Sequence, residues 1–344
     1  MTQTKKYITL GVGHGINDCA AGFIIGSLFY HGYSVVEMGI YTLAYNLIAF
    51  GGQLAVAKIV ESGFFPRRNL IGCFVLLMAA LLLLNAVPQL AILLSGVASA
   101  VFHVTGGLEA TRKDDKAFGI GIFASPGIVG LISGGLLAYL HIDILWPGVV
   151  VCAMYALFIF RFYRSSATEV YAKPQAAFER HDVIMCILIT VISLRSVIWD
   201  VVQMIEQHNY TWLMIIAVAA MCSKIIGGFL ADKIGYKKYT TYVLLLAIPF
   251  LTLLKKNIVA LSIGVLLLQS TIPSTTVMVL KVIRRKPAVA ISLSFGISVL
   301  IAIMVFYTPL VRYLDDNVVT ASILTVSIVL LWLYSRLRHF SKLK

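Results

Sequence analysis

The sequence predicts an all-α polytopic membrane protein with twelve transmembrane helices, arranged as two six-helix bundles. Of its 344 residues, 60% are hydrophobic and only 12% are charged, and the mean hydropathy is +0.92. A soluble domain is about half apolar and about a quarter charged. This composition therefore excludes a water-soluble enzyme and a soluble nucleic-acid-binding domain.

Twelve apolar segments approach the length of about 20 residues that a helix needs to cross a bilayer. A polar segment over residues 164–182 separates the first six from the last six. We therefore predict an N-terminal bundle over 1–163, a cytoplasmic linker over 164–182 and a C-terminal bundle over 183–344. The predicted spans lie near residues 7–29, 37–57, 69–86, 89–110, 117–139, 145–163, 183–202, 211–231, 239–254, 258–281, 288–309 and 318–335.

The basic residues set the predicted orientation. Lys and Arg number 28 against 15 Asp and Glu, which gives a net charge of +13. In the predicted topology only Lys255, Lys256 and Arg312 fall on one side, and nearly all other basic residues fall on the opposite side. Because cytoplasmic loops carry the excess of Lys and Arg, we predict that both termini are cytoplasmic. The basic residues are dispersed over several short loops, so we expect no nucleic-acid partner.

A loop signature follows the eighth predicted span. Residues 228–238 read GFLADKIGYKK, which resembles the signature G-x-L-A-D-R/K-x-G-R/K-R/K of the major facilitator superfamily, with Tyr236 at one basic position. The equivalent place in the first half, residues 52–58, reads GQLAVAK and resembles a partial second copy. The resemblance implies the major facilitator fold, in which two homologous bundles alternately open a central site to either side of the membrane.

The signature also has a physical interpretation. Asp232 ends a helix at its negative pole, which is unfavourable for an anion unless another helix N-terminus or a cation meets it. A contact of that kind, made in one conformation and broken in another, would be a latch; a solvated loop with ordinary interfacial charges is the alternative. We predict a gating loop formed by Gly228, Asp232, Lys233, Gly235, Lys237 and Lys238.

Two short segments resemble a narrower family. Residues 13–18 read GHGIND in the first span, and residues 102–107 read FHVTGG in the fourth. This pair is similar to the fosmidomycin-resistance type of bacterial exporter. Residues 121–130 resemble an antiporter motif, G-x-x-x-G-P-x-x-G-G, with Ser125 and Val129 at two glycine positions. These resemblances imply an antiporter for efflux in the bacterial inner, or plasma, membrane.

Ionisable side chains within the first and fourth spans are candidates for proton coupling. Each costs about 2.5–3.5 kcal/mol in hydrocarbon on insertion scales, so each needs a partner or a function. His14 and Asp18 share one helix face, and His103 lies at a similar depth. We predict that Asp18 carries the proton, with His14 and His103 as relay groups or substrate ligands. A structural hydrogen-bond network is one alternative, and transition-metal ligation by these three residues is another.

In the second half, Arg195 and Lys224 lie within spans and are predicted to bind an anionic substrate. Alternatively, Arg195 and Asp200 neutralise one another, or Lys224 extends toward the membrane surface. Glu109 and Arg112 end the fourth span, where we expect an interfacial ion pair or a gate element. Further candidates to line the substrate cavity, which ordinary interhelical hydrogen bonds would explain equally well, are Asn17, Tyr45 and Gln269.

The residues and the resemblance together predict a proton-coupled secondary active transporter that exports a small organic solute or drug, including anionic ones. Its expected partners are this solute, protons and the lipid bilayer, and we expect a monomer without cofactors. No G-x-x-x-x-G-K-S/T loop occurs, so the proton gradient rather than ATP is the expected energy source. Transport of a transition metal or metal chelate through His14, Asp18 and His103 is the alternative. A membrane-embedded enzyme that uses His14 and Asp18 matches no signature, so we expect no enzymatic activity.

Overall fold

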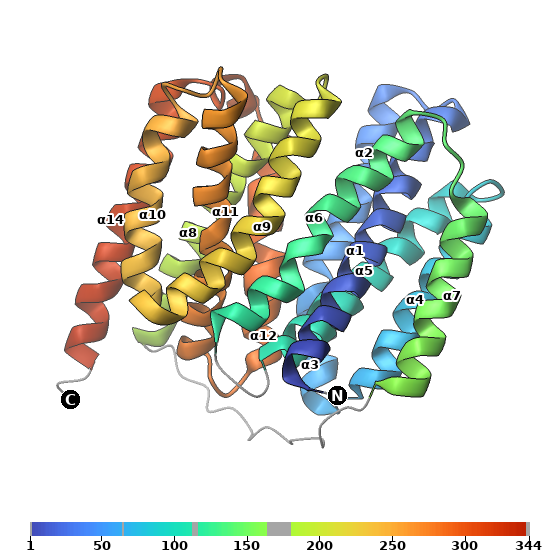
Figure 1. Ribbon diagram of the computed structural model, residues 1–344, viewed down its shortest axis with the longest axis horizontal. Coiled ribbons are helices and arrows are strands. Elements are labelled where there is room, and N and C mark those ends of the chain that lie inside the picture. The colour runs from blue at the N-terminus through green and yellow to red at the C-terminus, as the bar shows by residue number, and fades with distance from the viewer. Residues whose placement is uncertain (1, 64, 112–115, 164–179, 342–344) are drawn as a thin grey trace. The chain divides into compact units, whose positions relative to one another are not determined.

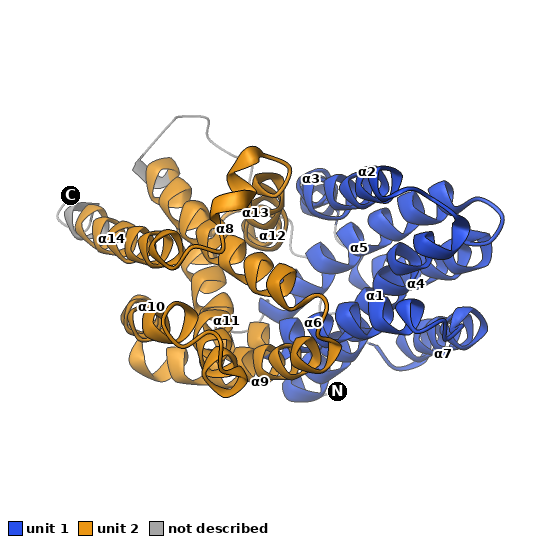
Figure 2. Ribbon diagram, turned by 90° about the horizontal axis from the view of Figure 1, so that it is seen from above, with its two compact units in different colours: residues 1–113, 122–171 blue, residues 114–121, 172–344 orange. Residues whose placement is uncertain are grey.

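The computed structural model describes residues 2–63, 65–111, 116–163 and 180–341. These residues form helices and contain no β-strand, which confirms the all-α prediction. The chain divides into two compact units, shown in Figure 2. The first contains residues 1–113 and 122–171, and the second contains residues 114–121 and 172–344. Of the predicted linker 164–182, residues 164–179 lie outside the described part of the chain. A helix begins at Arg180.

The first unit is built around α1 and α5 (Figure 1). Along α1, four glycines pack directly on the backbone or Pro126 of α6, and this close approach requires residues without a side chain. In addition, α5 packs on both α1 and α4. The helices of this unit are α1 (Gln3–Ser27), α2 (Val35–Asn46), α3 (Gln53–Ser62), α4 (Pro66–Leu83), α5 (Pro88–Thr111), α6 (Ala117–Tyr139, from residue 122 onward) and α7 (Leu145–Phe162).

In the second unit, α11 packs on both α9 and α10, and α8 packs on α13 and α14. The first turn of α6 also belongs to this unit, because Gly228 of α9 lies against the Ala117 carbonyl. The helices of this unit are α8 (Arg180–Glu206), α9 (Tyr210–Ile234), α10 (Tyr236–Leu251), α11 (Ile258–Val282), α12 (Pro287–Ser292), α13 (Ser298–Val305) and α14 (Asn317–Ser341).

Local sequence explains where several helices begin. Ser34 and Glu37 form a capping box at the start of α2, where each satisfies a backbone N–H of the other. The Asn257 side chain accepts hydrogen bonds from Val259 and Ala260 at the start of α11. Proline occupies the first positions of α4 and α12, where its missing N–H leaves no intrahelical hydrogen bond unmade.

Eleven helical stretches in the described part of the chain are long and apolar enough to cross a membrane. The predicted second span is composite: a π-helical segment, Leu47–Gly51, joins α2 to α3. Similarly, a π-helical segment at Leu293–Ile297 joins α12 to α13. The predicted span 239–254 corresponds to α10, which has only 16 residues. The prediction of twelve spans therefore requires this shorter helix to cross as well.

Candidate functional site

His14, Asp18 and His103 form one cluster in the first unit. Nε2 of His14 lies 3.1 Å from Oδ2 of Asp18 and 3.0 Å from Nε2 of His103. Nε2 of His103 lies 4.0 Å from Oδ1 of Asp18. The three side chains are 6%, 13% and 9% exposed, respectively. The structure thus brings together the three residues that the sequence singles out for proton coupling.

Backbone carbonyl groups fix the tautomers of both histidines. Nδ1 of His14 lies 2.9 Å from the carbonyl oxygen of Phe123, and Nδ1 of His103 lies 2.8 Å from that of Ser99. A carbonyl oxygen only accepts hydrogen bonds, so these contacts favour the tautomers in which both Nδ1 atoms carry the hydrogen. In two neutral rings, both Nε2 atoms are then acceptors that face one another. With Asp18 ionised, a third acceptor joins them, an arrangement that a proton or a metal cation between the three groups would stabilise.

Gly127 on α6 provides the space for this cluster. A Cβ atom at this position would lie 2.5 Å from Nε2 of His14 and 2.6 Å from Oδ2 of Asp18. The Phe123 ring, one turn earlier on α6, stacks on the His14 ring with centroids 4.8 Å apart. Neither residue was a predicted site residue. Gly127 falls at an unspecified position of the antiporter motif, between Ser125 and Val129, so no signal in the sequence pointed to it.

The interior proline of α6 lies beside this site. Pro126 lacks a backbone N–H, so the carbonyl of Ile122 loses its usual helical partner. The Ser125 hydroxyl donates to that carbonyl at 3.1 Å. Ser125 occupies a glycine position of the motif that α6 resembles, and it satisfies a backbone group that proline leaves free.

Two predicted substrate residues adjoin the cluster. Nδ2 of Asn17 donates to Oδ1 of Asp18 at 2.8 Å. Asn17 is fully buried, and its Oδ1 has no hydrogen-bond partner among the described residues. Tyr45 on α2 shares a side-chain hydrogen bond with Ser99, whose hydroxyl lies 3.2 Å from Nδ1 of His103. A buried polar chain therefore runs from α2 through α5 to α1.

The other predicted substrate residues lie on three helices of the second unit. Arg195 on α8 is 4% exposed, Lys224 on α9 is 6% exposed and Gln269 on α11 is 2% exposed. Gly121 of α6 packs against the backbone carbonyl of Lys224. All three side chains are buried, as expected of residues placed within spans, and their substrate role stays a prediction.

Asp200 does not neutralise Arg195 by direct contact. A Coulombic interaction joins the two groups, but within the described residues they form no ion pair at 4.0 Å or less. Nη2 of Arg195 donates to Ser196 at 3.5 Å, and its Nε has no hydrogen-bond partner in this part of the chain. Asp200 accepts from Gln203 at 3.4 Å through Oδ1, while its buried Oδ2 likewise has none.

Asp232 caps the N-terminus of α6. Its Oδ1 accepts from the backbone N–H of Ala117 at 2.9 Å, and its Oδ2 accepts from that of Phe118 at 3.0 Å. Tyr236 donates to Oδ1 at 3.0 Å. A helix N-terminus therefore meets the carboxylate, as the argument from the helix dipole requires. Tyr236, the departure from the family signature, contributes a hydrogen bond that the sequence analysis missed.

The rest of the predicted gating loop surrounds this cap. Gly235 ends α9 with φ +97°, a conformation that favours glycine. Nζ of Lys233 lies 4.2 Å from the centroid of the Phe229 ring. Lys237 and Lys238 lie in the first turn of α10.

Glu109 has a partner that the sequence did not indicate, while the expected interfacial ion pair with Arg112, or gate element, stays a prediction. Glu109 is fully buried, and its carboxylate forms an ion pair with Lys6 of α1. The Tyr163 hydroxyl donates to the same carboxylate at 2.5 Å. Arg112 lies outside the described residues. Because α5 packs against α1, Glu109 is enclosed within the first unit.

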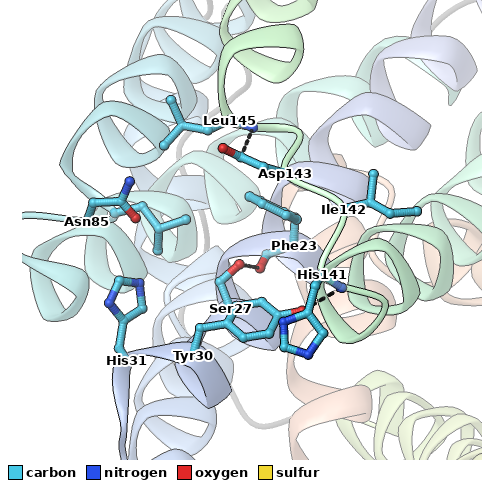
Figure 3. A pocket seen from close by; sticks show the side chains of 10 residues that line it. Phe23, Ser27, Tyr30, His31, Asn85, His141, Ile142, Asp143 and Leu145 are labelled. Carbon is cyan, nitrogen blue, oxygen red and sulfur yellow. Dashed lines mark hydrogen bonds between the residues drawn. The ribbon is translucent and has the colours of Figure 1, made fainter.

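A separate cavity of about 190 Å³ lies at the opposite end of α1 from the N-terminus (Figure 3). The backbone N–H of His141 donates to the Tyr30 hydroxyl at 2.9 Å, and His141 has φ +59°. His31 and Asp143 also line the cavity. Among the described residues, however, only His14, Asp18 and His103 bring their ligand atoms within 4.8 Å of one another as a candidate metal group.

Comparison with known proteins identifies the fold. No protein-family model matches the sequence, and no curated protein matches it. A crystal structure titled as a Major Facilitator Superfamily transporter, FucP, in the outward conformation is similar with a TM-score of 0.69 and 9% identity, over 96% of this chain and 98% of that one. The chain has the major facilitator fold.

Two further structures agree with this assignment. The E. coli fucose:proton symporter FucP, in a variant form, aligns with a TM-score of 0.70 and 10% identity, over 98% of this chain and 99% of that one. A bacterial homologue of the iron transporter ferroportin, in an outward-facing state, aligns with a TM-score of 0.66 and 13% identity, over 98% and 100%. At these identities the likeness establishes the major facilitator fold, and the exporter type stays a prediction.

Proposed function

We propose that this chain is a proton-coupled secondary transporter that exports a small organic solute in exchange for protons. Secondary transporters of the major facilitator fold bind their cargo between two bundles and expose it to alternate sides of the membrane. The antiporter and fosmidomycin-resistance resemblances favour export. We further propose that the protein is a monomer in a bacterial inner membrane, with both termini in the cytoplasm.

One observation carries the proton coupling: the Nε2 atoms of His14 and His103 face one another at 3.0 Å while both Nδ1 atoms are held by carbonyl oxygens. One added proton turns this repulsive contact into a hydrogen bond. In this proposal the proton lies between the two rings, and Asp18, which the sequence predicted as its carrier, balances its charge. When the proton leaves, three acceptors face one another, and the packing of α1, α5 and α6 must loosen or admit water. Protonation thus controls how closely three helices pack.

A single helix connects this cluster to the predicted latch. α6 supplies the Phe123 carbonyl and Gly127 to the cluster, while its first two residues, Ala117 and Phe118, donate to Asp232. Phe123 follows Phe118 by five residues, or about 7.5 Å along a helix. A shift of α6 that follows loss of the proton would therefore strain the cap at Asp232.

The decisive experiment compares Asp18→Asn with the unaltered protein in proteoliposomes under an imposed pH gradient, with fosmidomycin as the probe. We expect the substitution to abolish gradient-driven movement of the probe while the protein still inserts and folds. Asp143→Asn, which removes a carboxylate from the separate cavity, is the matched control and should transport normally. Unchanged pH-driven transport by Asp18→Asn would refute the role of Asp18 in proton coupling.

The same cluster supports a second candidate, the transport of a transition metal ion. Two imidazole nitrogens and a carboxylate are ligands such ions accept, and their ligand atoms converge within 4.8 Å. Calorimetric titration with Co²⁺ or Zn²⁺ distinguishes the candidates. Stoichiometric binding that His14→Gln and His103→Gln both abolish would favour metal cargo; heat changes unaffected by either variant would exclude this site for the ion.

A further inference from the structure

The Arg195 guanidinium has unused hydrogen-bonding capacity inside the second unit. An arginine carries five N–H donors. The one hydrogen bond that Arg195 makes in the described chain goes to Ser196 at 3.5 Å, the outer limit for such a bond. Its Nε makes none, although the residue is only 4% exposed. A buried donor without an acceptor is destabilising, so retaining one at this position calls for a function.

On the same helix, the Asp200 carboxylate lacks hydrogen-bond donors. Its Oδ1 accepts one long hydrogen bond from Gln203, and its Oδ2 accepts none from the described residues. The two groups attract one another without forming an ion pair. They are five residues apart on α8, which corresponds to about 7.5 Å along the helix axis and about 140° around it. A buried pair selected only for stability would be expected in direct contact, with its remaining hydrogen bonds satisfied.

We infer that the solute is dipolar, with an anionic group that Arg195 binds and, a few bonds away, a hydrogen-bond-donating or cationic group that Asp200 binds. A carboxylate, phosphonate or phosphate matches the planar fork of a guanidinium. An ammonium or hydroxyl group supplies the donor that Oδ2 of Asp200 lacks. Such a solute gives both Arg195 and Asp200 a hydrogen-bond partner, whereas a simple anion leaves Asp200 without one. This inference rests on the proposed transport function and specifies its cargo.

Binding without a gradient tests the inference. The purified full chain is heated in detergent with 3-aminopropylphosphonate, propylphosphonate or propylamine, and with homologues one methylene shorter and longer. We expect one dipolar member to raise the unfolding temperature at about tenfold lower concentration than either single-group analogue, because each analogue leaves one buried polar group without a partner. Equal stabilisation by all three compounds, or none by any homologue, would overturn the inference.

Two substitutions test which residue binds which end of the dipolar compound. Asp200→Asn should remove the advantage of the dipolar compound over propylphosphonate, and Arg195→Gln should remove its advantage over propylamine. Asp315→Asn is the control, because that carboxylate is 60% exposed and pairs with Lys255; it should keep the full preference. If both test variants only lower the unfolding temperature of the free protein and keep the preference, the pair is structural and the inference is wrong.

The outcome separates this inference from the proposed function. The binding measurement needs no proton gradient, so loss of dipolar preference leaves the test of Asp18 unaffected. Conversely, a dipolar preference that depends on Arg195 and Asp200 would stand even if Asp18→Asn continued to respond to pH. For a variant that does not fold, Arg195→Lys provides a second test: it keeps the charge, loses the planar fork and should weaken phosphonate binding.

Discussion

The Nε2 atoms of His14 and His103 lie 3.0 Å apart, and neither ring is free to present its other nitrogen. The carbonyl oxygens of Phe123 and Ser99 hold the two Nδ1–H groups. In the tautomers that these carbonyl contacts favour, the two Nε2 atoms are both acceptors, and the proposed function follows from the cation that would pair them.

His103→Gln should separate proton binding from folding. The glutamine amide can donate to Nε2 of His14, so the contact no longer needs an added proton. We expect the variant to fold but to lose solute movement driven by a pH gradient, and nitrogen NMR should show His14 remaining neutral where the unaltered cluster binds a proton. His31→Gln, in the separate cavity, is the matched control. A His14 signal that still reports protonation in the variant would contradict the shared-proton interpretation.

Gly127→Ala should disturb the cluster through one methyl group. The new Cβ would lie 2.5 Å from Nε2 of His14, so α6 or the cluster must move. We expect a loss of stability of about 1–3 kcal/mol, the usual range for an overpacked core, together with reduced proton-driven transport. Gly72→Ala is the control, because a Cβ there meets nothing within 4 Å. Thermal unfolding and flux of both variants check this, and equal behaviour would show that the space at Gly127 is unimportant.

The sequence was sufficient for properties that depend on one helix at a time. Composition and segment length predicted the helical membrane protein, and the position of Asp232 at a helix end predicted a helix N-terminus or a cation beside it. Which helix meets Asp232 depends on the first turn of α6, more than a hundred residues earlier, and no local pattern encodes that pairing. The pairing of Glu109 with Lys6 could not be predicted for the same reason, because Lys6 becomes a neighbour only when α5 packs on α1.

Asp232→Asn should weaken the cap on α6. The amide keeps one acceptor oxygen but removes the negative charge that the helix N-terminus attracts, an interaction worth about 0.3–1 kcal/mol. If the cap is a latch, the variant will favour the conformation in which the contact is broken, and cysteine labelling of α6 near Ala117 will increase. Asp316→Asn, which alters the cap of α14, should leave that labelling unchanged. Lower stability with unchanged labelling would mean that the cap is purely structural.

Glu109 and Lys6 should behave as a coupled pair. Glu109→Gln leaves Lys6 as an uncompensated buried charge, and breaking such a pair destabilises by about 3–5 kcal/mol. Replacing both partners together, as Lys6→Met with Glu109→Leu, should cost less than either single change, because no buried charge remains. Tyr163→Phe removes one hydrogen bond to the carboxylate and should cost about 1.5–3 kcal/mol. Thermal unfolding of Lys6→Met, Glu109→Leu and the double variant measures the coupling. Additive effects of the two partners would show that the ion pair contributes nothing of its own, and the burial of Glu109 would then need another explanation.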